Sequence, residues 1–320
     1  MRNPYRKELH YFAQTVAAAT IFLIIAGALV TSNDAGLSVP DWPLSHGQLM
    51  PEMVGGVFYE HGHRMVATTI GLLTIVLNIW LWKAESRAWV RRLGLIALAA
   101  VIAQGILGGV TVLFFLPTPV SVLHAVLAQL FFCLVVTLAL LLSPGWTNLS
   151  WPFSQVGRGA WNSGGSELRL AALTTAAVFC QLLLGAILRH SGSVDGTKGA
   201  VLVTSALLAH LMGALVVTGV IVFTSLVFIK RVGDRGIIRL VYLTLSLLVT
   251  QLFLGTGAYM VRIDWVNRVQ PSMEKVLITA SHVAVGALLL ATSLLLTLRI
   301  SRHAALKEHE SLESLARQAL

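Results

Sequence analysis

Eight long apolar runs, separated by short polar segments, make up most of the chain. Each run can cross the hydrocarbon core of a bilayer, about 30 Å thick, as an α-helix that rises about 1.5 Å per residue. Pro117 and Pro119 divide one very long apolar stretch, because a proline pair interrupts helical hydrogen bonding. The pattern predicts eight spanning helices, at residues 12–32, 62–82, 93–116, 119–142, 168–189, 201–229, 237–260 and 275–299.

The composition agrees with a membrane protein and excludes a soluble domain. Of the 320 residues, 56% are hydrophobic and 12% are charged, and the mean hydropathy is +0.79. The net charge of +9 does not indicate nucleic-acid binding, because the cations lie in short segments between apolar runs. Cys133 and Cys180 lie in separate runs and form no CxxC motif, so both are expected to be packing residues. The predicted fold class is an all-α integral membrane protein.

Basic residues are distributed unevenly between the two sides of the predicted bundle. Most of the 23 Lys and Arg residues lie near the termini or after even-numbered helices. The positive-inside rule therefore predicts a multi-pass protein of the cell membrane with both termini cytoplasmic. The first run resembles a signal peptide but is expected to be a retained helix, since the later spans need it for topology. The cations on the opposite, outer side are Arg64, Arg189, Lys198, Arg262, Arg268 and Lys275.

The chain is expected to divide into two pseudosymmetric four-helix bundles. Residues 1–142 form the N-terminal half and residues 168–300 the C-terminal half. Residues 143–167, rich in Gly, Pro and Ser, read as an interfacial linker between the halves, whose tryptophans are expected at the level of the lipid headgroups. Residues 301–320 are expected to be a cytoplasmic tail, either a short separate helix or a frayed end.

A repeated unit is visible inside the chain itself. The odd-numbered helices carry glycines near their outer ends, within residues 26–28, 104–109, 181–186 and 251–257. An outward loop and an even-numbered helix with one histidine near its start follow each time, and these residues are His63, His124, His210 and His282. The unit is a helical hairpin, used four times.

The four repeated histidines are expected at similar depth in the outer half of the membrane. Each could simply hydrogen-bond to a neighbouring helix, but four matching positions favour a shared chemical role. Imidazoles on facing helices can supply both axial ligands of a haem iron. The glycines would leave room for a flat macrocycle. Surface roles are expected for the remaining histidines, which are His10, His46, His190, His303 and His309. His61 is expected either to face the lipid headgroups or to hydrogen-bond a haem edge.

Ionisable residues gather where the second helix enters the membrane. Glu60, His61, His63 and Arg64 lie within five consecutive positions, and burying such groups without partners costs several kcal/mol. Glu60 and His63 are three residues apart and share one helical face, whereas His61 lies about 200° from His63. This stretch is either a candidate site or a solvated helix start.

Two motifs resemble those of a known family. The sequence GLSVPDWP at residues 36–43 and the sequence EHGHR at residues 60–64 resemble the haem A synthases, the Cox15/CtaA family. The likeness extends over the chain through the eight spans, the two halves and the four histidines. One departure is that this chain has no cysteine in the first or the fifth outer loop, so a thiol relay or disulfide at the outer face is not expected.

The resemblance implies an enzyme that oxidises the C8 methyl group of haem O to the formyl group of haem A. His63 and His124 would then bind the iron of substrate or product, Glu60 would be the catalytic carboxylate, and His210 with His282 would hold haem b. The expected partners are haem O, membrane lipid, a haem O synthase and assembly factors of terminal oxidases. The electron donor stays unidentified, and a homo-oligomer is allowed.

A mechanism and two alternatives follow from these assignments. Two successive hydroxylations would give a geminal diol that dehydrates to the aldehyde, while Glu60 relays protons or binds the hydroxylated intermediate. Some of the outer cations would neutralise haem propionates or, alternatively, bind lipid phosphates; the candidates are Arg64, Arg189, Arg262, Arg268 and Lys275, with Arg64 first because it adjoins His63. A di-haem electron carrier of the cytochrome b type would explain the histidines but not Glu60. A transporter would explain the repeat and would bind no haem.

Overall fold

The computed structural model describes all residues except 1–4, 148–164, 192–195, 265–270 and 319–320. The N-terminal half contains α1 (Lys7–Ser32), α2 (Gly55–Ala84), α3 (Ala88–Leu113) and α4 (Thr118–Leu141), followed by the short α5 (Pro144–Thr147). The C-terminal half contains α8 (Gly165–His190), α9 (Gly196–Arg231), α10 (Arg235–Asp264) and α11 (Met273–Gln318). The described residues form no β-strand, and eight of these helices are long and apolar enough to span a membrane. The predicted all-α fold with eight spans is confirmed.

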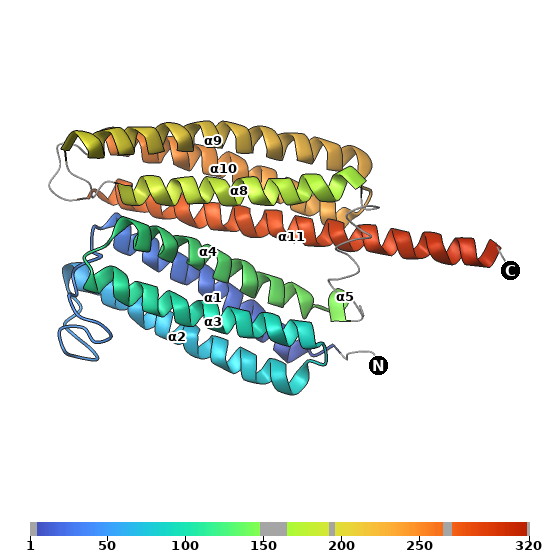
Figure 1. Cartoon of the computed structure of the whole chain (residues 1–320), viewed down its shortest axis with the longest axis horizontal. Coiled ribbons are helices and arrows are strands. Elements are labelled where there is room, and N and C mark those ends of the chain that lie inside the picture. The colour runs from blue at the N-terminus through green and yellow to red at the C-terminus, as the bar shows by residue number, and fades with distance from the viewer. Residues whose placement is uncertain (1–4, 148–164, 192–195, 265–270, 319–320) are drawn as a thin grey trace.

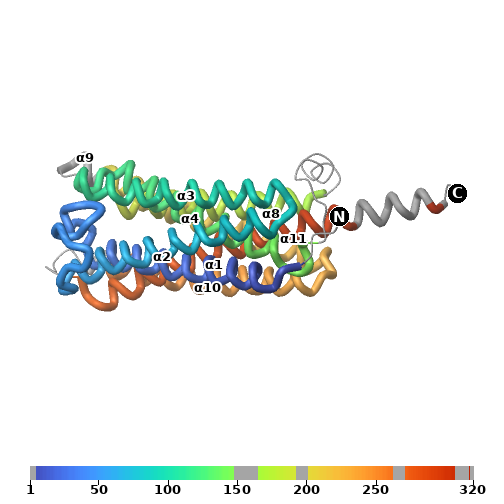
Figure 2. Tube along the Cα trace, turned by 90° about the horizontal axis from the view of Figure 1, so that it is seen from below, coloured from blue at the N-terminus to red at the C-terminus, as the bar shows by residue number. Residues whose placement is uncertain are grey.

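The two halves lie side by side as two layers of antiparallel helices (Figure 1). Within each half, consecutive helices pack as hairpins, α1 with α2, α3 with α4, α8 with α9 and α10 with α11. The α11 helix also contacts α1 and α4, so it joins the two layers along their length (Figures 1 and 2). Both chain ends lie at the same end of the bundle, and the α1–α2 loop lies at the opposite end.

Several helices extend beyond the predicted apolar runs, and two boundaries near the loops differ in an informative way. The α2 helix begins at Gly55 rather than at residue 62, so the whole polar stretch from Glu60 to Arg64 is helical. The α3 helix ends at Leu113, and Phe115 and Leu116, with φ angles of 59° and 57°, form the turn before Pro117. The helix therefore ends before the proline pair as predicted, but the turn begins at residue 114 and not at Pro117. Hydropathy detects the part of a helix that can face lipid and not its polar extension.

The expectation of a separate tail helix after residue 300 is wrong. The α11 helix continues without a break to Gln318 and extends beyond the bundle (Figure 1). Residues 300–318 contain no Gly or Pro, so nothing in this stretch ends the helix that begins at Met273. The apparent boundary in the sequence is a change from apolar to charged residues within one helix.

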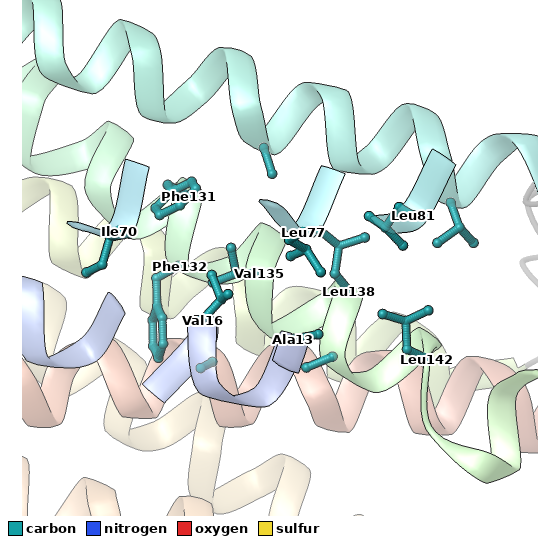
Figure 3. Close-up of a cluster of buried hydrophobic side chains, with 14 of the residues drawn as sticks. Ala13, Val16, Ile70, Leu77, Leu81, Phe131, Phe132, Val135, Leu138 and Leu142 are labelled. Atoms are coloured by element: carbon teal, nitrogen blue, oxygen red, sulfur yellow. The ribbon is translucent and has the colours of Figure 1, made fainter. Parts of the chain in front are cut away.

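The largest buried cluster fills the N-terminal half and reaches the second half. Val16 of α1, Leu77 of α2, and Phe131 and Leu138 of α4 are almost fully buried within it (Figure 3). Ala287 and Ala291 of α11 belong to the same cluster. Lipid tails are as apolar as these side chains, so the helices associate through close van der Waals packing and not through removal of apolar surface from water. Small residues at the contact between the halves permit that packing.

A polar clamp closes the bundle at the end where the chain termini lie. Arg87 donates to Glu85, and also to the carbonyl oxygens of Leu141 at 2.9 Å and of Trp146 at 2.9 Å. Arg302 of α11 lies over the Trp146 ring at 5.3 Å. Trp146 is 3% exposed because the clamp and α11 enclose it, and its expected depth at the lipid headgroups stays a prediction. Trp151 and Trp161 lie outside the described residues.

The two cysteines have different surroundings. Cys133 is half-buried and packs against the buried cluster of α8, α9, α10 and α11, as expected for a packing residue. Cys180 is exposed on the surface of the helical bundle, and both thiols are free. The packing role expected for both residues therefore applies to Cys133 alone.

Candidate functional site

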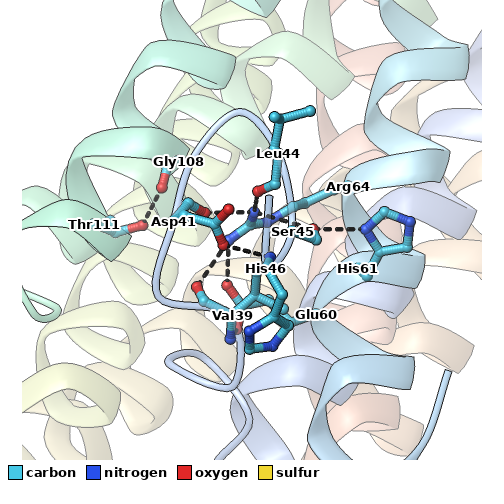
Figure 4. A network of polar contacts seen from close by, with 10 residues as sticks. All are labelled: Val39, Asp41, Leu44, Ser45, His46, Glu60, His61, Arg64, Gly108 and Thr111. Carbon is cyan, nitrogen blue, oxygen red and sulfur yellow. Dashed lines mark hydrogen bonds and ion pairs between the residues drawn. The ribbon is translucent and has the colours of Figure 1, made fainter. Parts of the chain in front are cut away.

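The α1–α2 loop is fixed to the start of α2 by Arg64 (Figure 4). One guanidinium nitrogen, Nη1, donates to the carbonyl oxygens of Asp41 and Leu44, both at 2.8 Å. The other, Nη2, donates to the carbonyl oxygen of Val39 at 3.1 Å and to Glu60 Oε1 at 2.6 Å. A planar fork of donors suits this arrangement, because one side chain holds three separate points of the loop. The predicted pairing of Arg64 with a propionate stays a prediction, and three of these four bonds already go to the loop and the fourth to Glu60 of α2.

Glu60 is part of the same network. Its side chain is 5% exposed, and its second oxygen, Oε2, accepts the Val39 amide hydrogen at 2.9 Å. Both carboxylate oxygens therefore have donors, as a buried charge requires. Glu60 and Arg64 stand one helical turn apart, so the α2 helix itself sets their geometry.

His61 does not face the lipid headgroups. It is 6% exposed, and its Nδ1 lies 2.8 Å from Ser45 Oγ in the loop. The expected surface role is wrong because the loop folds back over this face of α2. His10, also expected at the surface, is 8% exposed, and its Nδ1 lies 3.1 Å from the carbonyl oxygen of Ala139. His46 is exposed, as expected.

Asp41 organises the tip of the loop. Its carboxylate accepts the amide hydrogens of Gly47 at 2.8 Å and of His46 at 2.7 Å. These backbone hydrogen bonds, the one from Gly47 foremost, hold the pKa of Asp41 below its ordinary value of 3.8. Next to Asp41, Trp42 packs onto α3, where a Cβ atom added at Gly109 would lie 2.7 Å from the indole Cδ2. The loop therefore contacts α2 through Arg64 and α3 through Trp42.

Each of the four repeated histidines lies against a glycine of the preceding helix. A Cβ atom added at Gly27 would lie 3.0 Å from His63 Cε1, and the same measure is 3.3 Å for Gly108 with His124. In the C-terminal half it is 3.0 Å for Gly185 with His210 and 3.1 Å for Gly255 with His282. The repeat predicted from sequence is therefore present in the structure as one contact made four times. The glycines make room for the imidazole rings, where a macrocycle was expected to fill that space.

His210 and His282 face one another in the C-terminal half. Their ring centroids are 6.4 Å apart, and the ring planes make an angle of 77°. Two metal–nitrogen bonds of about 2 Å, with about 1 Å from each nitrogen to its ring centroid, span about 6 Å. The pair therefore fits the two axial positions of one haem iron, for which the porphyrin supplies the other four ligands.

His63 and His124 occupy the matching places in the N-terminal half. Their Nδ1 atoms are buried and lack a hydrogen-bond partner among the described residues, and the same is true of His282 Nδ1. Buried polar atoms without partners are uncommon, and each such atom indicates a missing ligand, water or rearrangement. The α1–α2 loop belongs to the same half, where Glu60 and Arg64 of α2 hold it through hydrogen bonds.

The other outer cations have partners within the protein or cannot be placed. Arg189 of α8 donates to the carbonyl oxygen of Thr31 in α1, and Lys275 Nζ of α11 lies 3.5 Å from Asp34 Oδ2. Both contacts join the C-terminal half to the end of α1. The side chains of Lys198, Arg262 and Arg268 lie outside the described part of the chain. A role for any of these residues at propionates stays a prediction.

The fold and the site define a helical membrane protein that carries a pair of matched histidines in each four-helix half. Residues 52–195 match the COX15-CtaA family model, described as cytochrome oxidase assembly protein. The matched segment, which contains Glu60, His63, Arg64 and His124, is therefore similar to that family. His210 and His282 lie beyond the matched segment, and their assignment depends on the internal repeat.

The similar proteins of known name share the name Heme A synthase. The chain is 30% identical over 140 residues to the Heme A synthase of Geobacillus kaustophilus (strain HTA426), which is 43% of this chain and 44% of the relative. It is 33% identical over 138 residues to that of Symbiobacterium thermophilum, 42% of this chain and 45% of the relative. The similarity thus spans less than half the length of these relatives.

Proposed function

We propose that the chain is a haem A synthase, a membrane oxidoreductase that oxidises the C8 methyl group of haem O to the formyl group of haem A. The observation that carries the proposal is the contact between histidine and glycine made in all four hairpins, which gives each half two positioned imidazoles. The family match and the name of the relatives support haem O as substrate.

The N-terminal half, residues 1–142, is the proposed substrate half. His63 and His124 would bind the iron of haem O and of haem A, and this binding would orient the porphyrin rim. Support comes from the α1–α2 loop, which adds a buried carboxylate and a second contact surface to this half. The family match also covers both of these histidines.

The C-terminal half, residues 168–300, is the proposed haem b half. His210 and His282 would hold this cofactor, and their 6.4 Å centroid separation supports that role. Haem b, when bound, supplies one-electron transfer. Residues 143–167 would link the halves, and residues 301–320 would stay outside the membrane.

Glu60 is the proposed catalytic carboxylate. A carboxylate that is held by two donors keeps a fixed orientation, which general acid–base chemistry requires. The Val39 amide and Arg64 provide these donors, so the loop and α2 together position the group. The loop would also exclude water from the outer end of the substrate half.

We further propose that both termini face the cytoplasm of a cell membrane, in agreement with the distribution of Lys and Arg. The substrate requires a haem O synthase as its source, and the product requires terminal oxidase assembly as its destination. The electron donor belongs to the same scheme but has no identified chemistry.

The test is expression in a host that makes haem O but no haem A. Wild-type protein should convert part of the membrane haem O to haem A, measured by extraction and chromatography. His63→Ala and His124→Ala should each abolish haem A, while the protein level and haem b content stay close to those of the wild type. Absence of haem A from cells that contain haem O and folded wild-type protein would overturn the proposed function.

A further inference from the structure

Three of the four glycines that contact a histidine are preceded, one helical turn earlier, by a glutamine. These residues are Gln104 before Gly108, Gln181 before Gly185 and Gln251 before Gly255. The register is the same in each case, since residues four apart lie on one face of a helix. Each glutamine can therefore reach the histidine that the glycine contacts.

All three carboxamides contact their histidines. Gln104 Nε2 donates to the His124 carbonyl oxygen at 2.9 Å. Gln181 Nε2 donates to the His210 carbonyl oxygen at 2.8 Å and lies 3.1 Å from its Nδ1. Gln251 Nε2 lies 3.4 Å from His282 Nε2. The α3, α8 and α10 helices thus each hold a histidine of the following helix through a glutamine as well as a glycine.

In two of these pairs, the glutamine has an acceptor without a partner and the histidine has a ring nitrogen without one. The Oε1 atoms of Gln104 and Gln251 are buried without a partner among the described residues, and so are the Nδ1 atoms of His124 and His282. A histidine that ligates a metal through Nε2 carries its hydrogen on Nδ1, and this hydrogen needs an acceptor. The carboxamide oxygen of the neighbouring glutamine can accept this hydrogen once the carboxamide leaves its present contact, which is the His124 carbonyl oxygen for Gln104 and His282 Nε2 for Gln251.

The first hairpin lacks this element. Leu23 of α1 occupies the position one turn before Gly27, so α1 offers His63 no carboxamide at this register. Leu23 packs against the hydrophobic cluster of the N-terminal half, and His63 Nδ1 is buried without a partner among the described residues. His63 therefore lacks the glutamine neighbour that each of the other three histidines has.

We propose that the glutamines determine how firmly each of the four histidines is held as an axial ligand, and that His63 is the exchangeable one. The inference rests on the proposed function, because it explains how one half retains a cofactor while the other releases its product. The C-terminal pair has two supported ligands, which suits a resident haem. The N-terminal pair has one supported ligand, His124, and one that can leave the iron when haem O enters or haem A departs.

The experiment adds a glutamine to the hairpin that lacks one and removes a glutamine from a hairpin that has one. Leu23→Gln adds the missing carboxamide, and Leu23→Met is its control of similar size without an amide. Gln181→Leu removes a carboxamide from the C-terminal half and leaves its histidine in place. Purified protein is mixed with excess apomyoglobin as haem acceptor, and the loss of each haem type is followed by absorbance and by chromatography of the extracted haems.

Removal of an outer-shell partner of a metal ligand typically weakens metal binding about 10-fold to 100-fold. Leu23→Gln should slow the loss of haem O and haem A about 10-fold relative to Leu23→Met and leave haem B loss unchanged. Gln181→Leu should speed haem B loss about 10-fold. Equal rates for Leu23→Gln and Leu23→Met, or unchanged haem B loss in a folded Gln181→Leu protein, would overturn the proposed role of the glutamines.

The two proposals fail in different ways. If the wild-type protein carries haem B alone, the proposed function fails, but the proposed role of the glutamines still predicts that haem leaves the N-terminal half first and that Leu23→Gln delays it. If haem A is made and both haems leave at rates that ignore the glutamines, only the proposed role of the glutamines fails. A thermal unfolding midpoint near the wild-type value identifies the variants that are folded.

Discussion

Substitution of alanine for Gly185 should remove haem from the C-terminal half without unfolding the protein. The added Cβ atom would lie 3.0 Å from His210 Cε1, whereas carbon atoms pack best about 3.5–4.0 Å apart. The imidazole must therefore move by about 0.5 Å, while metal–ligand distances tolerate only about 0.2 Å. We expect at least a 10-fold loss of haem b affinity, which is the scale for disturbed ligand positioning.

The sign of the stability change separates this effect from general damage. Glycine to alanine favours a helix by up to about 1 kcal/mol, so the protein without haem should be no less stable than wild-type protein treated to remove its haem. Gly105→Ala in α3 and Gly219→Ala in α9 are matched controls, since an added Cβ atom would meet nothing within 4 Å at either position. Both controls should retain haem.

The assay is haem content per protein, from the pyridine haemochrome of purified protein, together with the reduced absorbance spectrum. Gly255→Ala should behave like Gly185→Ala, because its added Cβ atom would lie 3.1 Å from His282 Cε1. Wild-type haem content and an unchanged spectrum in folded Gly185→Ala protein would refute the idea that the glycine positions the ligand.

Four further predictions concern the ligands, the carboxylate, the loop and the clamp. His210→Ala or His282→Ala should remove the low-spin haem b spectrum, since the iron would lack one axial ligand. Glu60→Gln should retain haem b but lower haem A production about 100-fold to 10,000-fold, whereas a purely structural carboxylate would lower stability, because the Arg64 charge loses its partner, and would leave turnover of the folded protein nearly intact. The pKa of Asp41 is lowered, so its carboxylate stabilises the loop at pH values above the ordinary pKa of 3.8, and this effect is lost as pH falls through the lower folded pKa. The Gly47 amide should therefore be protected from hydrogen exchange above that pH and less protected below it in the wild type, and it should lack this protection at every pH in Asp41→Ala. Arg87→Ala should lower the free energy of unfolding by about 1.5–3 kcal/mol, seen as a lower midpoint of thermal unfolding, because Glu85, at 1% side-chain exposure, loses the hydrogen bonds from the Arg87 guanidinium.

Hydropathy and the internal repeat were sufficient to predict much of the fold. Eight spans, hairpin pairing and the turn at Pro117 all follow from local patterns, because a membrane helix must satisfy its backbone internally and must match the bilayer thickness. The repeat also identified the glycines that lie beside the histidines. Its geometric meaning was missed, since the sequence does not tell whether a small residue makes space for a helix, a ring or a ligand.

The loop contacts could not be predicted from the sequence. The burial of His61 depends on Ser45, and the bonds of Arg64 go to backbone carbonyl oxygens of the loop, which have no signature in side-chain pattern. The contact of Trp42 with Gly109 joins distant segments in the same way. The glutamines were visible beside the glycines in three repeats, and the leucine at position 23 was the signal that the first hairpin differs.

The most direct test of the account is the identity of the haems that copurify with the protein. Protein isolated from a membrane that also contains haem O synthase should show Soret absorbance and should release haem B together with haem O, haem A or a hydroxylated form on extraction. His63→Ala should lose the second class and retain haem B. Haem B alone in wild-type protein would identify an electron carrier, and the absence of Soret absorbance would contradict any role for the four histidines in binding haem.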